Sequence, residues 1–105
     1  MALRVSKDNF SEEVLSEEKL VIADFYSDSC IPCKRLSPLL AEIEEEFSDR
    51  VKLVKININF DTELAEKYEV QSVPSVLFFK KGEEASRLSG AIRKAEITGT
   101  IDNIR

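Results

Sequence analysis

Cys30 and Cys33 are the residues of this sequence best suited to covalent chemistry, because they are its only cysteines and stand three positions apart. Side chains at that spacing on the first turn of a helix face the same side, so a reversible disulfide is geometrically natural. Two other roles stay open, half of a zinc site or a pair of unrelated buried cysteines. Zinc requires four ligands, and since the chain contains no histidine and no further cysteine, a metal site would need a dimer or carboxylate ligands. We expect no metal and no cofactor.

The segments on either side of the pair predict a strand before it and a helix after it. The run 20–26 is too uniformly apolar for a half-exposed strand and indicates a central strand covered on both faces. Pro32 is tolerated in a first helical turn, where the N–H that it lacks would be unbonded, so the helix should begin at about the pair. Pro38, inside that helix, should kink it. Apolar residues continue the helical spacing at Leu36, Leu39, Leu40, Ile43 and Phe47.

The start of a helix beside Cys30 has a chemical consequence. Unbonded N–H groups and the positive end of the helix dipole favour a thiolate over a thiol at that position. We therefore expect Cys30 to be the nucleophile. Cys33 stands one turn deeper and faces the core, so it is better placed to resolve a mixed disulfide than to begin one.

The motif around the pair resembles the active site of the thioredoxin family. The family motif Cys-Gly-Pro-Cys-Lys stands at a strand-to-helix junction, and Cys30-Ile31-Pro32-Cys33-Lys34 matches it with isoleucine in place of glycine. The resemblance covers the chain from about Phe10 to the C-terminus. A lone Cys-x-x-Cys is a weak signal, but further matches follow in family order. They are Asp24, Pro38, Lys55, Val73-Pro74-Ser75, Gly82 and Gly90.

Two residues beside the cysteines depart from the family pattern. Thioredoxins usually place tryptophan before the first cysteine and glycine after it, whereas this chain has Ser29 and Ile31 and contains no tryptophan. Because a flat indole normally forms part of the docking surface, the change bears on substrate range and on recognition by a reductase. Ile31 adds a β-branched side chain at the rim, where it either restricts access or offers an apolar contact to a chosen partner.

Asp24 is the one charged residue in its apolar run, so its side chain either turns to an edge or is buried at a cost of several kcal/mol. Burial would raise its pKa and make it able to take a proton from Cys33 during resolution. The resemblance favours this role. It also implies that Lys55 lies near Asp24 and moderates the pKa shift, whereas position alone allows a solvent-facing strand lysine.

Pro74 is ambiguous from the residues alone, because few X-Pro bonds are cis. The resemblance implies a cis bond that would aim the Val73 N–H and C=O outward beside Cys30, ready to pair with an extended substrate segment. Together with Ile31 and Pro32, these two residues are the expected substrate contacts.

The order of hydrophobic patterns predicts an α/β protein, with one domain over residues 1–105. The resulting order β-α-β-α-β-α-β-β-α requires a central mixed β-sheet with helices on both faces, because parallel neighbours need helical crossovers. The resemblance implies the same thioredoxin-like fold. Strands are expected at 2–5, 20–26, 51–58, 76–79 and 85–89, and helices near 8–15, from the pair to 47, across 62–68 and over 97–104.

The charge and hydrophobicity of the sequence limit the kinds of partner and the location that we expect. A net charge of −5 argues against nucleic acid and against an anionic membrane. No segment has the pattern of a signal peptide or a membrane span, so we expect a cytoplasmic location. In such a reducing compartment a Cys-x-x-Cys pair is more often catalytic than structural. We also expect a monomer.

The favoured function is a thiol-disulfide oxidoreductase that reduces protein disulfides through Cys30 and Cys33. A thioredoxin reductase as electron donor is implied by the resemblance. The alternative is a thioredoxin-like binding module for a dedicated partner, with a regulatory or structural disulfide. Ser29 and Ile31 are the main support for that alternative.

Overall fold

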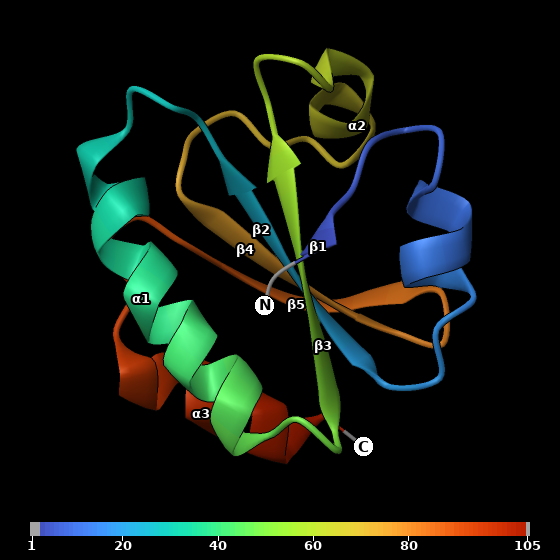
Figure 1. Cartoon of the computed structure of the whole chain (residues 1–105), viewed down its shortest axis with the longest axis vertical. Coiled ribbons are helices and arrows are strands. Elements are labelled where there is room, and N and C mark those ends of the chain that lie inside the picture. Colours follow the sequence, from blue (N-terminus) through green and yellow to red (C-terminus); the bar gives the residue numbers. More distant parts are fainter. Residues whose placement is uncertain (1–2, 105) are drawn as a thin grey trace.

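The structure is a computed structural model that describes residues 3–104, and in these residues strands and helices alternate along most of the chain (Figure 1). The elements are β1 (Leu3–Arg4), a helical turn (Ser11–Leu15), β2 (Leu20–Tyr26), α1 (Ile31–Glu46), β3 (Val51–Asn57), α2 (Thr62–Lys67), β4 (Ser75–Lys80), β5 (Glu83–Ser89) and α3 (Lys94–Asn103). The strands form one sheet in the order β1-β3-β2-β4-β5. The first three strands are parallel, whereas β4 runs antiparallel to both β2 and β5.

The predicted order of elements and the predicted mixed sheet are confirmed. The starts of the first and last helical segments differ from the prediction by three residues, since the first begins at Ser11 rather than near residue 8 and the last at Lys94 rather than at Ile97. The Glu96 carboxylate accepts a hydrogen bond of 3.0 Å from the Arg93 N–H at that end and so caps the helix early. Residue 2, in the first predicted strand, lies outside the described residues.

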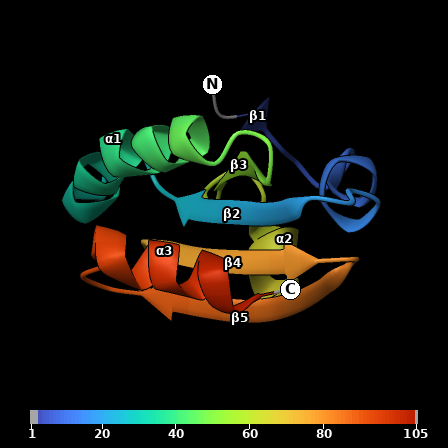
Figure 2. The same cartoon turned by 90° about the horizontal axis from the view of Figure 1, so that it is seen from below.

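Alternation along β2 divides the core into two layers. Val21, Ala23 and Phe25 point to the face covered by the helical turn and α2, whereas Leu20 and Ile22 point to the face covered by α1 and α3. Figures 1 and 2 show these two pairs of helical segments on opposite faces of the sheet. The prediction of a central strand covered on both faces is confirmed, and it follows that residues of even number on β2 lie beneath α1.

The helical turn Ser11–Leu15 is wider than an ordinary α-helix. The Ser16 N–H donates to the Ser11 carbonyl at 3.0 Å, five residues back along the chain. The turn is held on the sheet by rings, because Phe10 lies 5.3 Å from Tyr68 and 5.7 Å from Phe79 between ring centroids. Three aromatic side chains in edge or tilted contact therefore fix the face opposite to α1.

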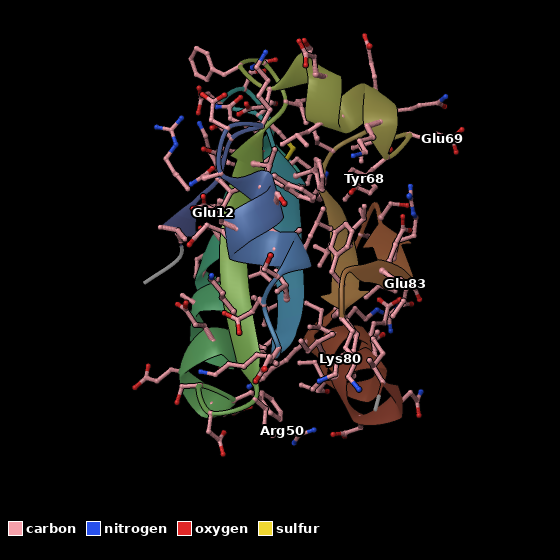
Figure 3. The ribbon with its side chains drawn as sticks, turned by 90° about the vertical axis from the view of Figure 1, so that its right-hand side faces the viewer. Glu12, Arg50, Tyr68, Glu69, Lys80 and Glu83 are labelled. Carbon is pink, nitrogen blue, oxygen red and sulfur yellow. A yellow bond between two sulfur atoms is a disulfide. The ribbon has the colours of Figure 1, made fainter. Side chains whose placement is uncertain are left out.

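The β4–β5 hairpin leaves β5 at the edge of the sheet. Its turn has positive φ at Lys81 (52°) and at Gly82 (82°), as a type I′ hairpin turn requires. Figure 3 shows Lys80 and Glu83 on either side of this turn. The pairing of β4 with β5 shifts register, since Phe78 faces Ser86 but Phe79 faces Glu84, which leaves Ala85 as a bulge.

Arg87 on β5 connects the edge strand to the end of α2. Its guanidinium donates two hydrogen bonds to the Glu84 carboxylate, at 2.6 and 2.8 Å, and a third to the Tyr68 carbonyl at 2.8 Å. The edge of the sheet therefore presents a bulge and an ion pair rather than a flat row of backbone groups.

Candidate active site

The two cysteines lie at the junction of β2 and α1, as predicted, and they are joined as a disulfide. Cys30 is the N-cap residue of α1, and its Sγ accepts a hydrogen bond of 3.1 Å from the Cys33 N–H. Cys30 is half-buried, whereas Cys33 is only 4% exposed. A helix N-terminus directs a backbone donor and its positive end at the more accessible sulfur, which is the arrangement that stabilises a thiolate.

The loop that carries Cys30 is fastened to the neighbouring strand. The Asn57 side-chain amide, at the end of β3, donates to the Asp28 carboxylate at 3.3 Å. The Asn57 side-chain oxygen in turn accepts from the Asn59 N–H at 2.9 Å. Asn57 is buried and Asp28 is exposed, so this partly buried contact holds the residues before Cys30 against the sheet.

Asp24 is buried rather than turned to an edge. Its side chain is 1% exposed, and neither carboxylate oxygen has a hydrogen-bond partner. It lies beneath α1 because it shares the even parity of Leu20 and Ile22 on β2. Burial raises the pKa of Asp24 to about 6, and the charge of Lys55 opposes that rise. A carboxyl group in this state can exchange a proton near neutral pH.

Lys55 lies on the neighbouring strand in register with Asp24. Its ammonium does not form an ion pair with that carboxylate. It donates to the Ser37 hydroxyl on α1 at 3.0 Å, and it stands 4.9 Å from the centre of the Tyr26 ring. Lys55 therefore acts on Asp24 through its charge while its hydrogen bond is made elsewhere, a position between the two alternatives that the sequence left open.

A surface cavity of about 380 Å³ opens beside this group, between α1 and the ends of β2 and β3. Cys33, Lys55 and Ser37 are among the residues that line it. The cavity opens to the surface on the side of α1 where the buried cysteine lies. The buried cysteine is therefore bordered by an open surface cavity, although Asp24 itself does not line it.

On the other side of α1, a groove of about 520 Å³ runs past the Val73–Pro74 peptide bond. That bond is cis, as the resemblance implies. Pro32, Val73 and Pro74 all line the groove. Within residues 3–104 the Val73 N–H and C=O make no hydrogen bond, whereas the Pro74 carbonyl accepts one from the Gly90 N–H at 3.2 Å.

The remaining predicted site residues, Ile31, Ser29 and Pro38, lie near the disulfide but line no part of the groove. Ile31 is 62% exposed at the start of α1 but does not line the groove, and Ser29 is also exposed. Helix α1 continues through Pro38, and the kink predicted there stays a prediction.

Several residues of the site were missed by the reading of the sequence. Ser37 follows Cys33 by four positions and so lies on the same face of α1, a spacing that could have drawn attention to it. Asn57 and its bond to Asp28 join segments 29 residues apart and left no local signal. Arg35 and Arg93 line the groove although they come from different helical segments.

Within residues 3–104, no three acidic or cysteine side chains gather closely enough to hold a metal ion. Across the same residues, no helix combines the length and apolar character that a membrane span requires.

Comparison with known proteins gives one consistent result. The family model described as Thioredoxin matches residues 1–103. Thioredoxin of Acidithiobacillus ferridurans is 37% identical over 96% of this chain and 94% of its own length. Thioredoxin of Rickettsia bellii is 36% identical over 98% of both chains. Thioredoxin 1 of Synechococcus elongatus is 33% identical over 97% of this chain and 95% of its own length.

Proposed function

This chain belongs to the thioredoxin family and is a thiol-disulfide oxidoreductase, and we propose that it reduces protein disulfides through attack by Cys30 and resolution by Cys33. The observation that carries the proposal is the hydrogen bond from the Cys33 N–H to the Cys30 sulfur at the N-terminus of α1. The same backbone donor would stabilise a thiolate at Cys30 in the reduced protein.

The reaction starts from the dithiol form. The Cys30 thiolate attacks one sulfur of the substrate disulfide, the substrate S–S bond breaks, and the departing substrate thiolate takes up a proton. Cys33 then loses its proton and attacks the Cys30 sulfur of the mixed disulfide, which releases the second substrate thiolate. Two electrons have passed to the substrate, and the protein is left with the Cys30–Cys33 disulfide seen in the structure.

Asp24 is proposed as the group that accepts the proton of Cys33, directly or through water. Its support is its place beneath α1, its unpaired carboxylate oxygens and its pKa of about 6. A base must be unprotonated to act. With a pKa of about 6, most of the Asp24 carboxyl is unprotonated at neutral pH. Lys55, held by Ser37, keeps that pKa from rising further.

The unbonded Val73 N–H and C=O are proposed to hold the substrate. They are free to pair with an extended segment laid along the groove, in the manner of an added strand. Pro32 and Pro74 would contact the same segment as apolar walls, and Ile31 would meet it at the exposed rim. A thioredoxin reductase is the proposed electron donor. The cytoplasm is the proposed compartment, because this protein must receive electrons from its donor in the same compartment.

A single-turnover assay tests the two cysteine roles. Reduced protein is mixed with a disulfide-bonded peptide, free thiols are alkylated, and all species are weighed by mass spectrometry. The native protein should convert one peptide disulfide for each Cys30–Cys33 disulfide that it forms. Cys33→Ser should stop at a one-to-one mixed disulfide, and Cys30→Ser should give no product. Full turnover by Cys30→Ser would show that the roles are assigned wrongly. A native protein that converts none of the peptide would favour the binding module.

The direction of transfer is tested by the equilibrium reduction potential in thiol-disulfide buffers. A value below about −250 mV is expected for a reductase. A value above about −200 mV would place the protein among oxidants or isomerases and contradict the proposed direction.

A further inference from the structure

The groove beside the disulfide combines apolar walls with two arginine side chains. Leu36, Leu39 and Ile92 supply apolar lining, while Arg35 extends from α1 and Arg93 from the N-cap of α3. Both arginines are exposed. The groove therefore offers a segment laid in it both apolar contact and positive charge.

Neither guanidinium is used within the part of the chain that the structure describes. No ion pair or side-chain hydrogen bond joins Arg35 or Arg93 to another residue between 3 and 104. Other arginines are paired, Arg50 with Asp102 and Arg87 with Glu84. Arg4 on β1 is likewise exposed and makes no such contact between residues 3 and 104, so what distinguishes Arg35 and Arg93 is their place in the groove.

The chain does not lack carboxylates that could have paired with them. It contains 20 acidic residues against 15 basic ones. Lys94, next to Arg93, is already paired with Glu42 and Glu46 of α1, at 2.9 and 3.3 Å. No acidic residue lines the groove itself. In a protein of net charge −5, the groove is locally positive and open to an incoming carboxylate.

We propose that this groove selects protein disulfides that carry an aspartate or glutamate close to the cysteine attacked by Cys30. This inference rests on the proposed function. A segment paired with the Val73 backbone would direct alternate side chains toward the groove walls, where an arginine fork can hold a carboxylate by two parallel hydrogen bonds.

The expected preference is modest, because both arginines are exposed. Exposed ion pairs and complementary charges at a rim are expected to change kcat/KM by roughly threefold to tenfold between an acidic and a neutral substrate. The preference should fall as salt is raised, since the charges are screened.

The test uses three disulfide peptides that differ only in the residues flanking one cysteine, which are Asp, Asn or Lys. The native protein should reduce the Asp peptide roughly threefold to tenfold faster than the Asn peptide, measured as kcat/KM. In the double variant Arg35→Gln/Arg93→Gln this ratio should fall to about one, and in Arg35→Glu/Arg93→Glu the Lys peptide should become the better substrate.

Arg50→Gln is the control for loss of a surface charge, because it removes one positive charge, against two in the groove variant, from an exposed arginine in the loop after α1, at the end of that helix remote from the cysteines (Figure 3). It should keep the native ratio. The inference would be overturned if the native protein and the groove variants had the same ratio of kcat/KM between the Asp and Asn peptides. It would also be overturned if Arg50→Gln lowered that ratio as much as the groove variants do. Failure of the native protein to reduce any of the three peptides would instead refute the proposed function, so the two failures are distinguishable.

Discussion

Replacement of Asp24 by asparagine should make the stability of the protein less dependent on pH. The pKa of Asp24 is about 6 in the fold against an ordinary value of 3.8, because the side chain is buried and unbonded. Each pKa unit corresponds to 1.36 kcal/mol, so ionisation of this carboxyl costs the folded state about 3 kcal/mol. Asparagine keeps the shape of the side chain and removes the charge.

The pH range follows from the direction of the shift. Below about pH 4 the carboxyl is protonated in both the folded and the unfolded chain, and it contributes no pH dependence. Between about pH 4 and pH 6 the unfolded chain has lost the proton while the folded chain retains it, so stability falls as pH rises. Above about pH 6 both forms are ionised, and the full cost of about 3 kcal/mol persists.

Urea unfolding of the oxidised native protein and of Asp24→Asn, from pH 4 to pH 8, measures this cost. All other titrating groups are shared, so their effects cancel in the difference between the two free energies of unfolding. That difference should change in favour of the variant by most of the 3 kcal/mol and then stay constant above pH 7. Asp24→Ala should show the same dependence on pH, with a different offset due to its smaller side chain. A difference that does not vary with pH would refute the assignment of a raised pKa.

Three further outcomes test other parts of the site and fold. In the reduced protein, Asp24→Asn should slow release of the mixed disulfide by about a hundredfold near pH 7, the low end of general-base effects, and the deficit should shrink at high pH; an unchanged rate in stopped-flow measurements would remove Asp24 from the mechanism. Lys55→Met removes the charge that opposes the shift, so the pKa of Asp24 should rise above 6 and the fall in stability should extend to higher pH in the same urea series; a fall that ends at lower pH would contradict this. Gly82→Ala should lose about 1–2 kcal/mol of stability and more than Gly90→Ala, because both glycines have positive φ but only at Gly82 would a Cβ stand 3.1 Å from the Leu15 carbonyl oxygen; equal losses would show that this contact is unimportant.

The sequence predicted the elements well because each carried a strong local signal. The run at β2 and the repeat after Pro32 fix a strand and a helix by periodicity alone. The wide turn Ser11–Leu15 was expected only as a helix, because the i to i+5 bonding depends on how Phe10 docks between Tyr68 and Phe79. No local pattern contains that information.

Some residues of the candidate site could be placed from the sequence, whereas contacts between separate elements could not. The cysteine spacing and the helix start set the geometry of the disulfide in advance, and the resemblance supplied the cis isomer at Pro74. Parity along β2 would also have placed Asp24 beneath α1. The hydrogen bond from Lys55 to Ser37 was not predictable, because it depends on how far α1 stands from β3 once both are packed.

The exposed strand β5 has a consequence for a protein proposed to bind extended chains. A long flat edge pairs with strands of any partner, including another copy of the same protein, so an unprotected edge would compete with the groove for segments of substrate. The bulge at Ala85 interrupts the regular spacing of the edge, and the Glu84–Arg87 ion pair places charge along it. Such features discourage adventitious pairing and self-association. At the β5 edge these features would leave less competition for the short Val73 segment, where we propose that substrate pairs.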